Sequence, residues 1–586
     1  MLKLFKYFKP YIWGLMLLVV LVFIQALANL QLPDYMAKIV NQGIVLQNKD
    51  LILQTGLAML GISLLGGIAT VGVGFFASRI ATGFAKDIRA KAFAKVEAFS
   101  LREIDTFSTA SLITRTTNDI QQIQMVLVMV LRLVIMAPIL GIGAIIKAYS
   151  MAPSISWVIT LPVIMIFGLM TVLFTVALPK FKIVQKLVDK LNLVTRENLT
   201  GLRVIRAFNR EGFEEGKFEQ ANRDLTDVNL FVNRVMSLMQ PMLLLIFNLT
   251  AVAIIWFGAH EIQAGNLMVG DMLAFMQYAL QVIMSFLFIS MMFIMVPRAV
   301  VSARRVSEII NTKLSVIDPE KPVLFPQDSH GNIEFRDVTF AYPASEIPVL
   351  KHISFTAKRG ETTAIIGSTG SGKSTLVNLI PRLYDVTGGA IFIDGVDIRT
   401  VKQADLHDKI GYVPQKGVLF SGSVKSNITY GKPEASEEAV KNAAGIAQAE
   451  EFIKELENTY DAPISQGGSN VSGGQKQRLS IARAIVKKPE IYIFDDSFSA
   501  LDFKTDAALR KALVHETKDS SVIIVTQRIS SVLHADSIIV LDEGKIAGIG
   551  KHEELLASSR VYKEIALSQL SEEELHKSGL HDTDIK

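Results

Sequence analysis

Six apolar stretches, each long enough to cross a membrane as a helix, occupy the first half of this chain and constrain its fold more than any other feature. A bilayer core of about 30 Å requires about 20 residues of α-helix. Half of the 586 residues are apolar and the mean hydropathy is +0.35, values too high for an ordinary soluble protein. The sequence therefore predicts spans at Ile12–Leu32, Leu53–Ala77, Met125–Ala148, Ile155–Leu178, Pro241–Glu261 and Met272–Val296.

The distribution of basic residues predicts the orientation of these spans. Long polar, helix-prone segments rich in Lys and Arg separate the second span from the third and the fourth from the fifth. The other side has only Lys38 and Lys49, with Lys147 near the end of the third span. Because basic residues concentrate on the cytoplasmic side, we expect a multi-pass protein of the cell membrane with both termini and the long segments in the cytoplasm.

Three features of the sequence argue against other classes of protein. The N-terminal run resembles a secretory signal, but it lacks a small-x-small cleavage site and continues to about Leu30, which favours a retained first span. The chain has no cysteine, which excludes disulfides, thiolate metal sites and cysteine nucleophiles. The net charge of +4 is small for this length and gives no support to nucleic-acid binding.

The second half of the chain has a different pattern, in which short β-type runs such as "TTAIIG", "EIYIF" and "SVIIVT" alternate with helical stretches. This alternation is typical of an α/β domain whose ligand lies at the carboxyl ends of the strands. We therefore expect a multidomain membrane protein: an all-α transmembrane domain at 1–311, a linker at 312–330, an α/β P-loop nucleotide-binding domain at 331–568 and a polar tail at 569–586.

A glycine-rich loop in "TTAIIGSTGSGKSTLVNLI" has the spacing of a phosphate-binding loop, after a strand and before an apolar-periodic helix. Its backbone N–H groups converge on phosphates, its lysine reaches the outer phosphates and its serine hydroxyl ligates Mg²⁺. Asp495, at the end of the apolar strand "IYIFD", is the expected partner of that metal. The predicted phosphate-loop residues are Gly367, Ser368, Thr369, Gly370, Ser371, Gly372, Lys373, Ser374 and Thr375.

A second glycine motif, "NVSGGQKQRLSIARAI", narrows the choice among nucleotide-binding families. It resembles the signature of the ATP-binding-cassette (ABC) family, with Val471 as one conservative change at its first position. In that family the signature opens a helix facing the nucleotide of the opposite cassette. A second anion site in a domain with one nucleotide of its own implies a partner cassette. The predicted signature residues are Ser472, Gly473, Gly474 and Gln475.

The resemblance covers essentially the whole chain, because six spans followed by one cassette is the half-transporter layout of ABC exporters, including the multidrug type. It implies ATP and Mg²⁺ as cofactors, Tyr342 as the aromatic residue on adenine and Gln415 as a metal contact. It places Asp502, in "SALD", in the loop that crosses the dimer interface. It also implies coupling helices on the cytoplasmic segments, near Ile104–Ser111 and Glu197–Phe208.

Two positions depart from the family pattern. Asp496 replaces the glutamate that positions the attacking water, and its carboxylate is shorter by one methylene. Gln527 replaces a histidine that contacts the γ-phosphate, and glutamine neither becomes a cation nor shuttles a proton near neutral pH. The binding positions are intact, so this combination resembles the degenerate-site subunit of bacterial heterodimeric ABC exporters. Its own site is expected to bind ATP and hydrolyse it slowly, while its signature serves the partner.

Three functions agree with the sequence: export of amphiphilic small molecules by a heterodimer, homodimeric export of a peptide or lipid with slow ATP hydrolysis, and an ATP-gated membrane sensor. The sixth span interleaves methionines with Gln277, Gln281 and Phe286, which favours a pocket for varied apolar ligands, although methionine facing lipid explains the same pattern. Arg132, inside the third span, is expected to face a cavity or a partner helix. The methionines are Met272, Met276, Met284, Met291, Met292 and Met295.

Overall fold

The computed structural model describes residues 6–343 and 345–569, so the predicted polar tail lies outside the described residues except for Gln569. The chain forms two compact units. Unit 1 comprises residues 1–97 and 110–312, and unit 2 comprises residues 98–109 and 313–586. A short segment between two helices of unit 1 therefore belongs to unit 2.

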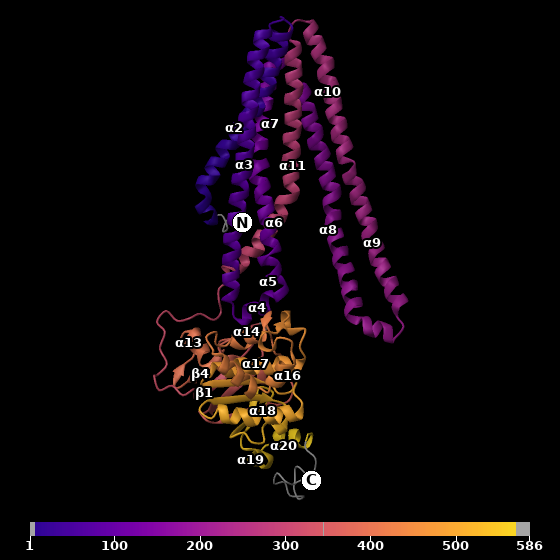
Figure 1. The fold of residues 1–586 in the computed structure, drawn as a ribbon. Coiled ribbons are helices and arrows are strands. Elements are labelled where there is room, and N and C mark those ends of the chain that lie inside the picture. Colours follow the sequence, from indigo (N-terminus) through magenta and orange to yellow (C-terminus); the bar gives the residue numbers. More distant parts are fainter. Residues whose placement is uncertain (1–5, 344, 570–586) are drawn as a thin grey trace. The chain divides into compact units, whose positions relative to one another are not determined.

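The described residues of unit 1 form helices joined by short turns, and among them six helical segments are long and apolar enough to cross a membrane, as the sequence predicts. Several continue far beyond the bilayer, since α3 has 49 residues and a length of roughly 70 Å at 1.5 Å per residue. The long polar segments are thus extensions of the membrane helices, and α8 and α9 lie side by side (Figure 1). The main helices are α2 (Ile12–Lys38), α3 (Lys49–Glu97), α5 (Thr109–Thr116), α6 (Asn118–Met129), α7 (Met136–Met151), α8 (Trp157–Ala207), α9 (Glu211–Ser237), α10 (Met239–Gln263) and α11 (Val269–Asn311).

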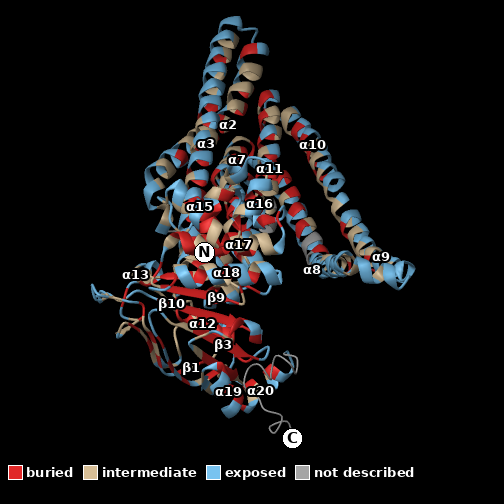
Figure 2. Ribbon diagram, turned by 60° about the horizontal axis from the view of Figure 1, so that its bottom comes forward, coloured by how far each residue is buried: buried red, intermediate tan, exposed pale blue. Residues whose placement is uncertain are grey.

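Unit 2 is an α/β domain built on a six-stranded sheet with the order β12-β11-β3-β10-β9-β6, parallel except for β12. The central strands are buried along their length (Figure 2), in agreement with their continuous apolar sequences. The strands of this sheet are β3 (Thr362–Gly367), β6 (Ile410–Val413), β9 (Ile491–Asp495), β10 (Ser521–Thr526), β11 (Ser537–Asp542) and β12 (Lys545–Gly550).

The remaining elements of unit 2 cover this sheet and extend it. A four-stranded antiparallel sheet has the order β2-β1-β4-β5, and β7 pairs with β8. The strands of these two sheets are β1 (Ile333–Phe340), β2 (Leu350–Ala357), β4 (Gly388–Ile393), β5 (Val396–Asp397), β7 (Gly422–Ser423) and β8 (Pro463–Ile464). The helices of unit 2 are α4 (Leu101–Phe107), α12 (Lys373–Leu379), α13 (Gln403–Asp408), α14 (Val424–Thr429), α15 (Glu437–Ile446), α16 (Glu450–Glu455), α17 (Gly473–Lys487), α18 (Phe503–Glu516), α19 (His552–Ser558) and α20 (Arg560–Leu567).

Candidate nucleotide site

Three neighbouring strands of the main sheet bring the predicted site together. Strand β10 lies between β3 and β9 and is parallel to both, so their carboxyl ends lie at one edge. The phosphate loop follows β3 and Gln527 follows β10. Asp495 is the last residue of β9, and Asp496 comes directly after it. Sequence positions separated by more than a hundred residues therefore meet, at the edge where ligands bind in such sheets.

The phosphate loop depends on glycine at two positions. Gly372 has a φ of +101°, and an added Cβ would lie 2.8 Å from Cδ2 of Leu350. A Cβ at Gly367 would lie 2.2 Å from the carbonyl oxygen of Leu541. Lys373 Nζ donates to the carbonyl oxygens of Gly367 and Ser368, at 2.8 and 2.7 Å. The loop therefore wraps around the ammonium of Lys373. Oxygens of a bound phosphate would compete with these two carbonyl oxygens for that ammonium.

Burial lowers the pKa of the Lys373 ammonium, whereas the nearby Asp496 and Asp495 charges oppose that shift. Burial also raises the pKa of the Asp495 carboxyl, although the hydrogen bond from Ser374 acts in the opposite direction. One buried ammonium and two carboxylates therefore lie close together at the end of a strand. Such perturbed groups in one place are typical of functional sites.

The residues expected to hold Mg²⁺ lie together. Ser374 Oγ donates to Asp495 Oδ1 at 3.0 Å, and Gln415 Nε2 donates to Asp496 Oδ2 at 3.3 Å. Hydroxyl, amide and carboxylate oxygens are hard donors of the kind that Mg²⁺ prefers. Within the described ranges no group of three or more His, Cys, Asp or Glu could hold a metal. A hydroxyl, an amide and a carboxylate fit Mg²⁺, which usually takes its other ligands from phosphate and water.

The two positions that depart from the family pattern both lie at this edge. Thr369 Oγ1, from the phosphate loop, donates to Gln527 Oε1 at 3.4 Å, and Asp496 contacts Gln415. The backbone of Asp496 has a φ of +46°, in the left-handed region that aspartate adopts more readily than most residues. This conformation was not predicted from the sequence, because an apolar strand followed by two aspartates does not show where the strand turns.

Tyr342 lies beside the phosphate loop. Its hydroxyl is 3.0 Å from Thr375 Oγ1, and its ring packs edge-on against Phe340 and Tyr384. The ring is thus held by the packing of the antiparallel sheet. This position agrees with the predicted contact to a base, which stays a prediction.

The signature residues form the start of α17 and lie apart from the phosphate loop of the same chain. Ser472 caps the helix in a capping box, in which its Oγ accepts from the Gln475 N–H at 3.3 Å. A Cβ added to Gly474 would lie 3.2 Å from the carbonyl oxygen of Ala500, so the signature contacts the "SALD" loop. Asp502 caps α18 by accepting from the Thr505 N–H at 2.9 Å. No hydrogen bond of the described chain joins the signature to the phosphate loop.

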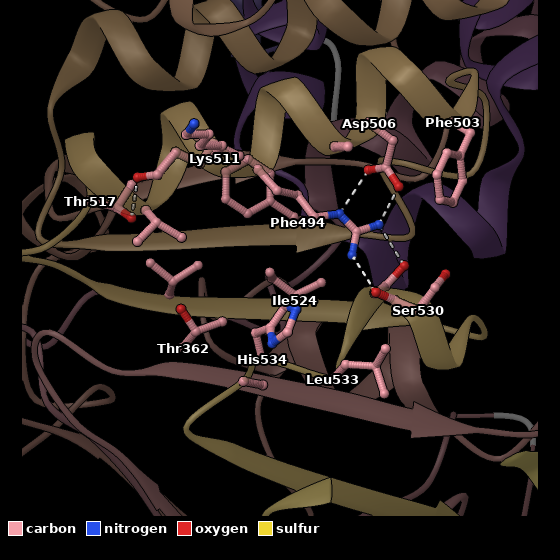
Figure 3. A pocket seen from close by; sticks show the side chains of 17 residues that line it. Thr362, Phe494, Phe503, Asp506, Lys511, Thr517, Ile524, Ser530, Leu533 and His534 are labelled. Atoms are coloured by element: carbon pink, nitrogen blue, oxygen red, sulfur yellow. Dashed lines mark hydrogen bonds and ion pairs between the residues drawn. The ribbon is translucent and has the colours of Figure 1, made fainter. Parts of the chain in front are cut away.

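A cavity of about 730 Å³ lies behind the same strand ends, between α18, strands β9 and β10 and the turn after Gln527 (Figure 3). Its walls are largely apolar and include Phe494 and Ile524. Arg510 lines it, pairing with Asp506 on its own helix and donating to Ser531 Oγ at 2.8 Å. The phosphate loop does not line this cavity, so the nucleotide site lies outside it.

The first predicted coupling segment, Ile104–Ser111, covers most of α4 and the start of α5. Helix α4 is part of unit 2: Tyr384 Oη donates to Asp105 Oδ2 at 2.6 Å, and Leu101 packs on the core of the cassette. Burial and Asp105 raise the pKa of the Tyr384 hydroxyl, which keeps it a donor at neutral pH. The second segment, Glu197–Phe208, is not a separate short helix, because α8 continues to Ala207.

The membrane helices contain polar contacts that were not predicted from the sequence. Asp34 of α2 accepts from Tyr278 Oη of α11 and from Lys147 Nζ of α7, each at 2.6 Å. Nearby, a cavity of about 280 Å³ is lined by Asn29, Gln277 and Gln281 together with Leu32, Pro33, Met36, Met59 and Leu140. Its two glutamines belong to the sixth span as predicted, but its methionines come from α2 and α3. Arg132 lies exposed in a π-helical turn of the third span, and the side chain of Met291 lies outside the described part.

Comparisons with known proteins agree with this geometry. The family pattern described as the transmembrane region of ABC transporters matches residues 15–286, and the pattern described as ABC transporter matches residues 350–499. An ABC transporter ATP-binding protein of Mycobacterium tuberculosis is 41% identical over 96% of this chain and 97% of its own length. YfiB of Bacillus subtilis, another ABC transporter ATP-binding protein, is 36% identical over 97% of this chain and 99% of its own.

More distant relatives extend the similarity. YheI of Bacillus subtilis, described as a probable multidrug resistance ABC transporter ATP-binding/permease protein, is 34% identical over 78% of each chain. The solved structure of a bacterial Atm1-family ABC exporter with ATP bound has a TM-score of 0.79 and 26% identity, covering 96% of this chain and 99% of that chain. The similarity therefore includes both units, in the same order along the chain.

Proposed function

The chain belongs to the ABC transporter family as an exporter-type half-transporter with a fused transmembrane domain and ATP-binding cassette, and from this premise we propose that it is the slowly hydrolysing subunit of a heterodimeric exporter. It is a multi-pass membrane protein, and the family implies a cytoplasmic cassette with ATPase activity. Of the two ATP sites in the dimer, the partner's site hydrolyses ATP rapidly and the site of this chain hydrolyses it slowly.

A difference between binding and catalytic residues carries the proposal. The contacts of Lys373, Ser374 and Asp495 support binding of phosphate and Mg²⁺, since the lysine donates to two carbonyl oxygens of the loop and the serine donates to the aspartate. The carboxylate of Asp496 is shorter than glutamate by about 1.5 Å, and a 1 Å misplacement can cost about a hundredfold in rate. Gln527 cannot become cationic as a histidine can. Two independent catalytic groups are therefore weakened, while the binding residues are retained.

In an ABC dimer each signature acts on the nucleotide of the other cassette, and here the signature is complete apart from its first residue. Helix α17 has 15 residues, begins with a capping box and presents two glycines at its N-terminus. Such a helix end favours phosphate through its free N–H groups and its dipole. We therefore assign this signature to the partner's competent site, with ATP and Mg²⁺ bound at both sites.

The proposed substrates are amphiphilic small molecules. The cavity between α2, α3, α7 and α11 combines side-chain amides with apolar groups and two methionines. Amides both donate and accept hydrogen bonds, and methionine adapts to apolar ligands of varied shape. Polar groups within a membrane domain are costly and usually line a substrate path. Similarity to a probable multidrug resistance transporter supports the same class.

Coupling between cassette and membrane helices is expected to depend on the contact of α4 with Tyr384. Tyr384→Phe removes only the hydroxyl that donates to Asp105. We expect transport into sealed vesicles to fall about threefold to tenfold, with basal ATPase activity changed less than about twofold. Tyr460→Phe is the matched control, because the Tyr460 hydroxyl is buried and has no hydrogen-bond partner among the described residues. Equal losses of transport and ATPase would contradict a coupling role.

Isolation of the full chain from its native membrane tests the heterodimer. The tagged chain is expected to co-purify with a second half-transporter in a one-to-one ratio, and the chain produced alone is expected to hydrolyse ATP slowly. Mass measurement of the complex distinguishes this result from a homodimer. A verified homodimer with rapid ATP turnover would exclude the proposed role and leave homodimeric export as the remaining function. A complex that hydrolyses ATP without moving any substrate would favour the sensor.

A further inference from the structure

The loop that carries Gln527 is short and has few internal contacts. It begins where β10 ends at Thr526 and leads into the 3₁₀ turn Ile529–Ser531. The Arg528 N–H donates to Thr526 Oγ1 at 3.1 Å, and Arg528 Nη2 donates to the Ser499 carbonyl oxygen at 3.0 Å. Neither bond involves the Gln527 carbonyl oxygen or the Ile529 N–H, and the side chain of Gln527 is exposed. The position of this side chain therefore depends on further contacts.

One of these contacts comes from α18. Arg510 donates to the Ser530 carbonyl oxygen at 3.2 Å and to Ser531 Oγ at 2.8 Å. These bonds hold the far end of the 3₁₀ turn. They leave the Gln527 carbonyl oxygen and the Ile529 N–H to another partner.

That partner is Gln569, the last described residue. Its Nε2 donates to the Gln527 carbonyl oxygen at 2.7 Å, and its Oε1 accepts from the Ile529 N–H at 2.9 Å. One primary amide thus satisfies the Gln527 carbonyl oxygen and the Ile529 N–H, on either side of Arg528. The two bonds have opposite direction, so they need a side chain that both donates and accepts, as an amide does.

Gln569 is itself firmly held. Its N–H donates to the Ala566 carbonyl oxygen at 3.1 Å, directly after α20. Ala566 and Tyr562 of α20 are fully buried in the same core cluster as Ile529. The amide therefore joins the loop to a helix that is packed on the sheet, and it fixes the loop with respect to the strand ends.

We propose that Gln569 is a positioning residue for Gln527, holding it beside the phosphate loop so that its side chain meets the terminal phosphate of ATP. The contact of Gln527 with Thr369 of that loop is long, at 3.4 Å, so a small displacement of the backbone removes it. Gln569, which follows α20, thereby takes part in the chemistry of the cassette. The inference rests on the proposed role of Gln527 and is independent of the heterodimer.

Hydrolysis and binding measured on the full chain in lipid nanodiscs test this role. Gln569→Met keeps the length of the side chain and removes both hydrogen bonds. We expect kcat to fall about threefold to tenfold, while the Kd for ATP and the Tm change little. Ser568→Ala is the control, since Ser568 bonds only within the end of α20 and is expected to change neither rate nor affinity.

Two truncations separate the amide from the residues beyond it. A chain ending at Gln569 retains the amide and is expected to keep the full rate. A chain ending at Ser568 lacks it and is expected to match Gln569→Met. Equal losses in both truncations would assign the effect to the tail and overturn the proposal.

A double-mutant cycle with Gln527→Ala shows whether the effect passes through Gln527. Once Gln527→Ala has lowered kcat, adding Gln569→Met is expected to cause no further loss. Additive losses would mean that Gln569 acts elsewhere and would overturn the positioning role alone. If Gln527→Ala leaves kcat unchanged, the proposed role of Gln527 fails and this inference fails with it. If Gln527→Ala lowers kcat and Gln569→Met does not, only the positioning role is excluded.

Discussion

Replacing Gly474 by aspartate in the assembled transporter is expected to reduce ATP turnover about a hundredfold, because loss of the phosphate contact to one preorganised donor at a site of developing charge costs about that much. Gly474 lies at the N-terminus of α17, where an added Cβ would already be 3.2 Å from the Ala500 carbonyl oxygen. A carboxylate there also repels the phosphate that the helix end is proposed to attract. Steady-state phosphate release from the purified complex measures the loss.

The contrast with Asp496 makes this prediction specific. Asp496→Ala is expected to reduce turnover less than about twofold, since the site it belongs to contributes little to the total rate. Gly216→Asp provides a control with the same change of residue, because an added Cβ at Gly216 meets no other atom within 4 Å. Larger losses for Asp496→Ala than for Gly474→Asp would identify Asp496 as the working carboxylate.

Restoring the family residues in this chain is expected to accelerate hydrolysis by the chain produced alone. The double variant Asp496→Glu with Gln527→His returns the missing methylene and the missing cation, and we expect a gain of about tenfold to a hundredfold. Gln527 is exposed, so a histidine fits without repacking the core. The left-handed backbone of Asp496 suits glutamate less well, which places Asp496→Glu alone at the lower end of the range.

Lys373→Ala in the restored background is the control for this gain. The lysine belongs to the same phosphate loop, so its removal is expected to abolish the added activity by preventing ATP binding. A gain that survives Lys373→Ala would come from a contaminating ATPase. No gain in the double variant, with ATP binding intact, would show that these two positions do not limit the rate.

The membrane spans are the part of the fold that the sequence predicts most fully. Their apolar composition is imposed by the bilayer, and all six predicted stretches lie within helices of the structure. Their lengths were not predictable in the same way, because polar helix-forming residues continue α3 without a break signal, and α8 continues past Pro179, a residue that usually ends or kinks a helix. The same continuity explains why Glu197–Phe208 forms the end of α8 instead of a separate helix.

At the nucleotide site, local motifs were sufficient to name residues but not to describe their contacts. Glycine spacing identified Gly367 through Thr375, and the end of an apolar strand identified Asp495, because these features are short and contiguous. The hydrogen bond from Tyr384 to Asp105 joins residues 279 positions apart, and no sequence pattern marks it. The contact of Gln569 with the Gln527 loop was missed for the same reason, since a polar residue near a chain end resembles ordinary surface.

The nucleotide bound to each chain after one turnover tests the asymmetry of the two sites most directly. The co-purified complex is photolabelled with azido-ATP that carries its radiolabel on either the α- or the γ-phosphate, and the two chains are then separated. This chain is expected to retain both labels, because it still holds ATP, whereas the partner retains only the α-label. Loss of the γ-label from both chains at the same rate would contradict a slowly hydrolysing site in this chain.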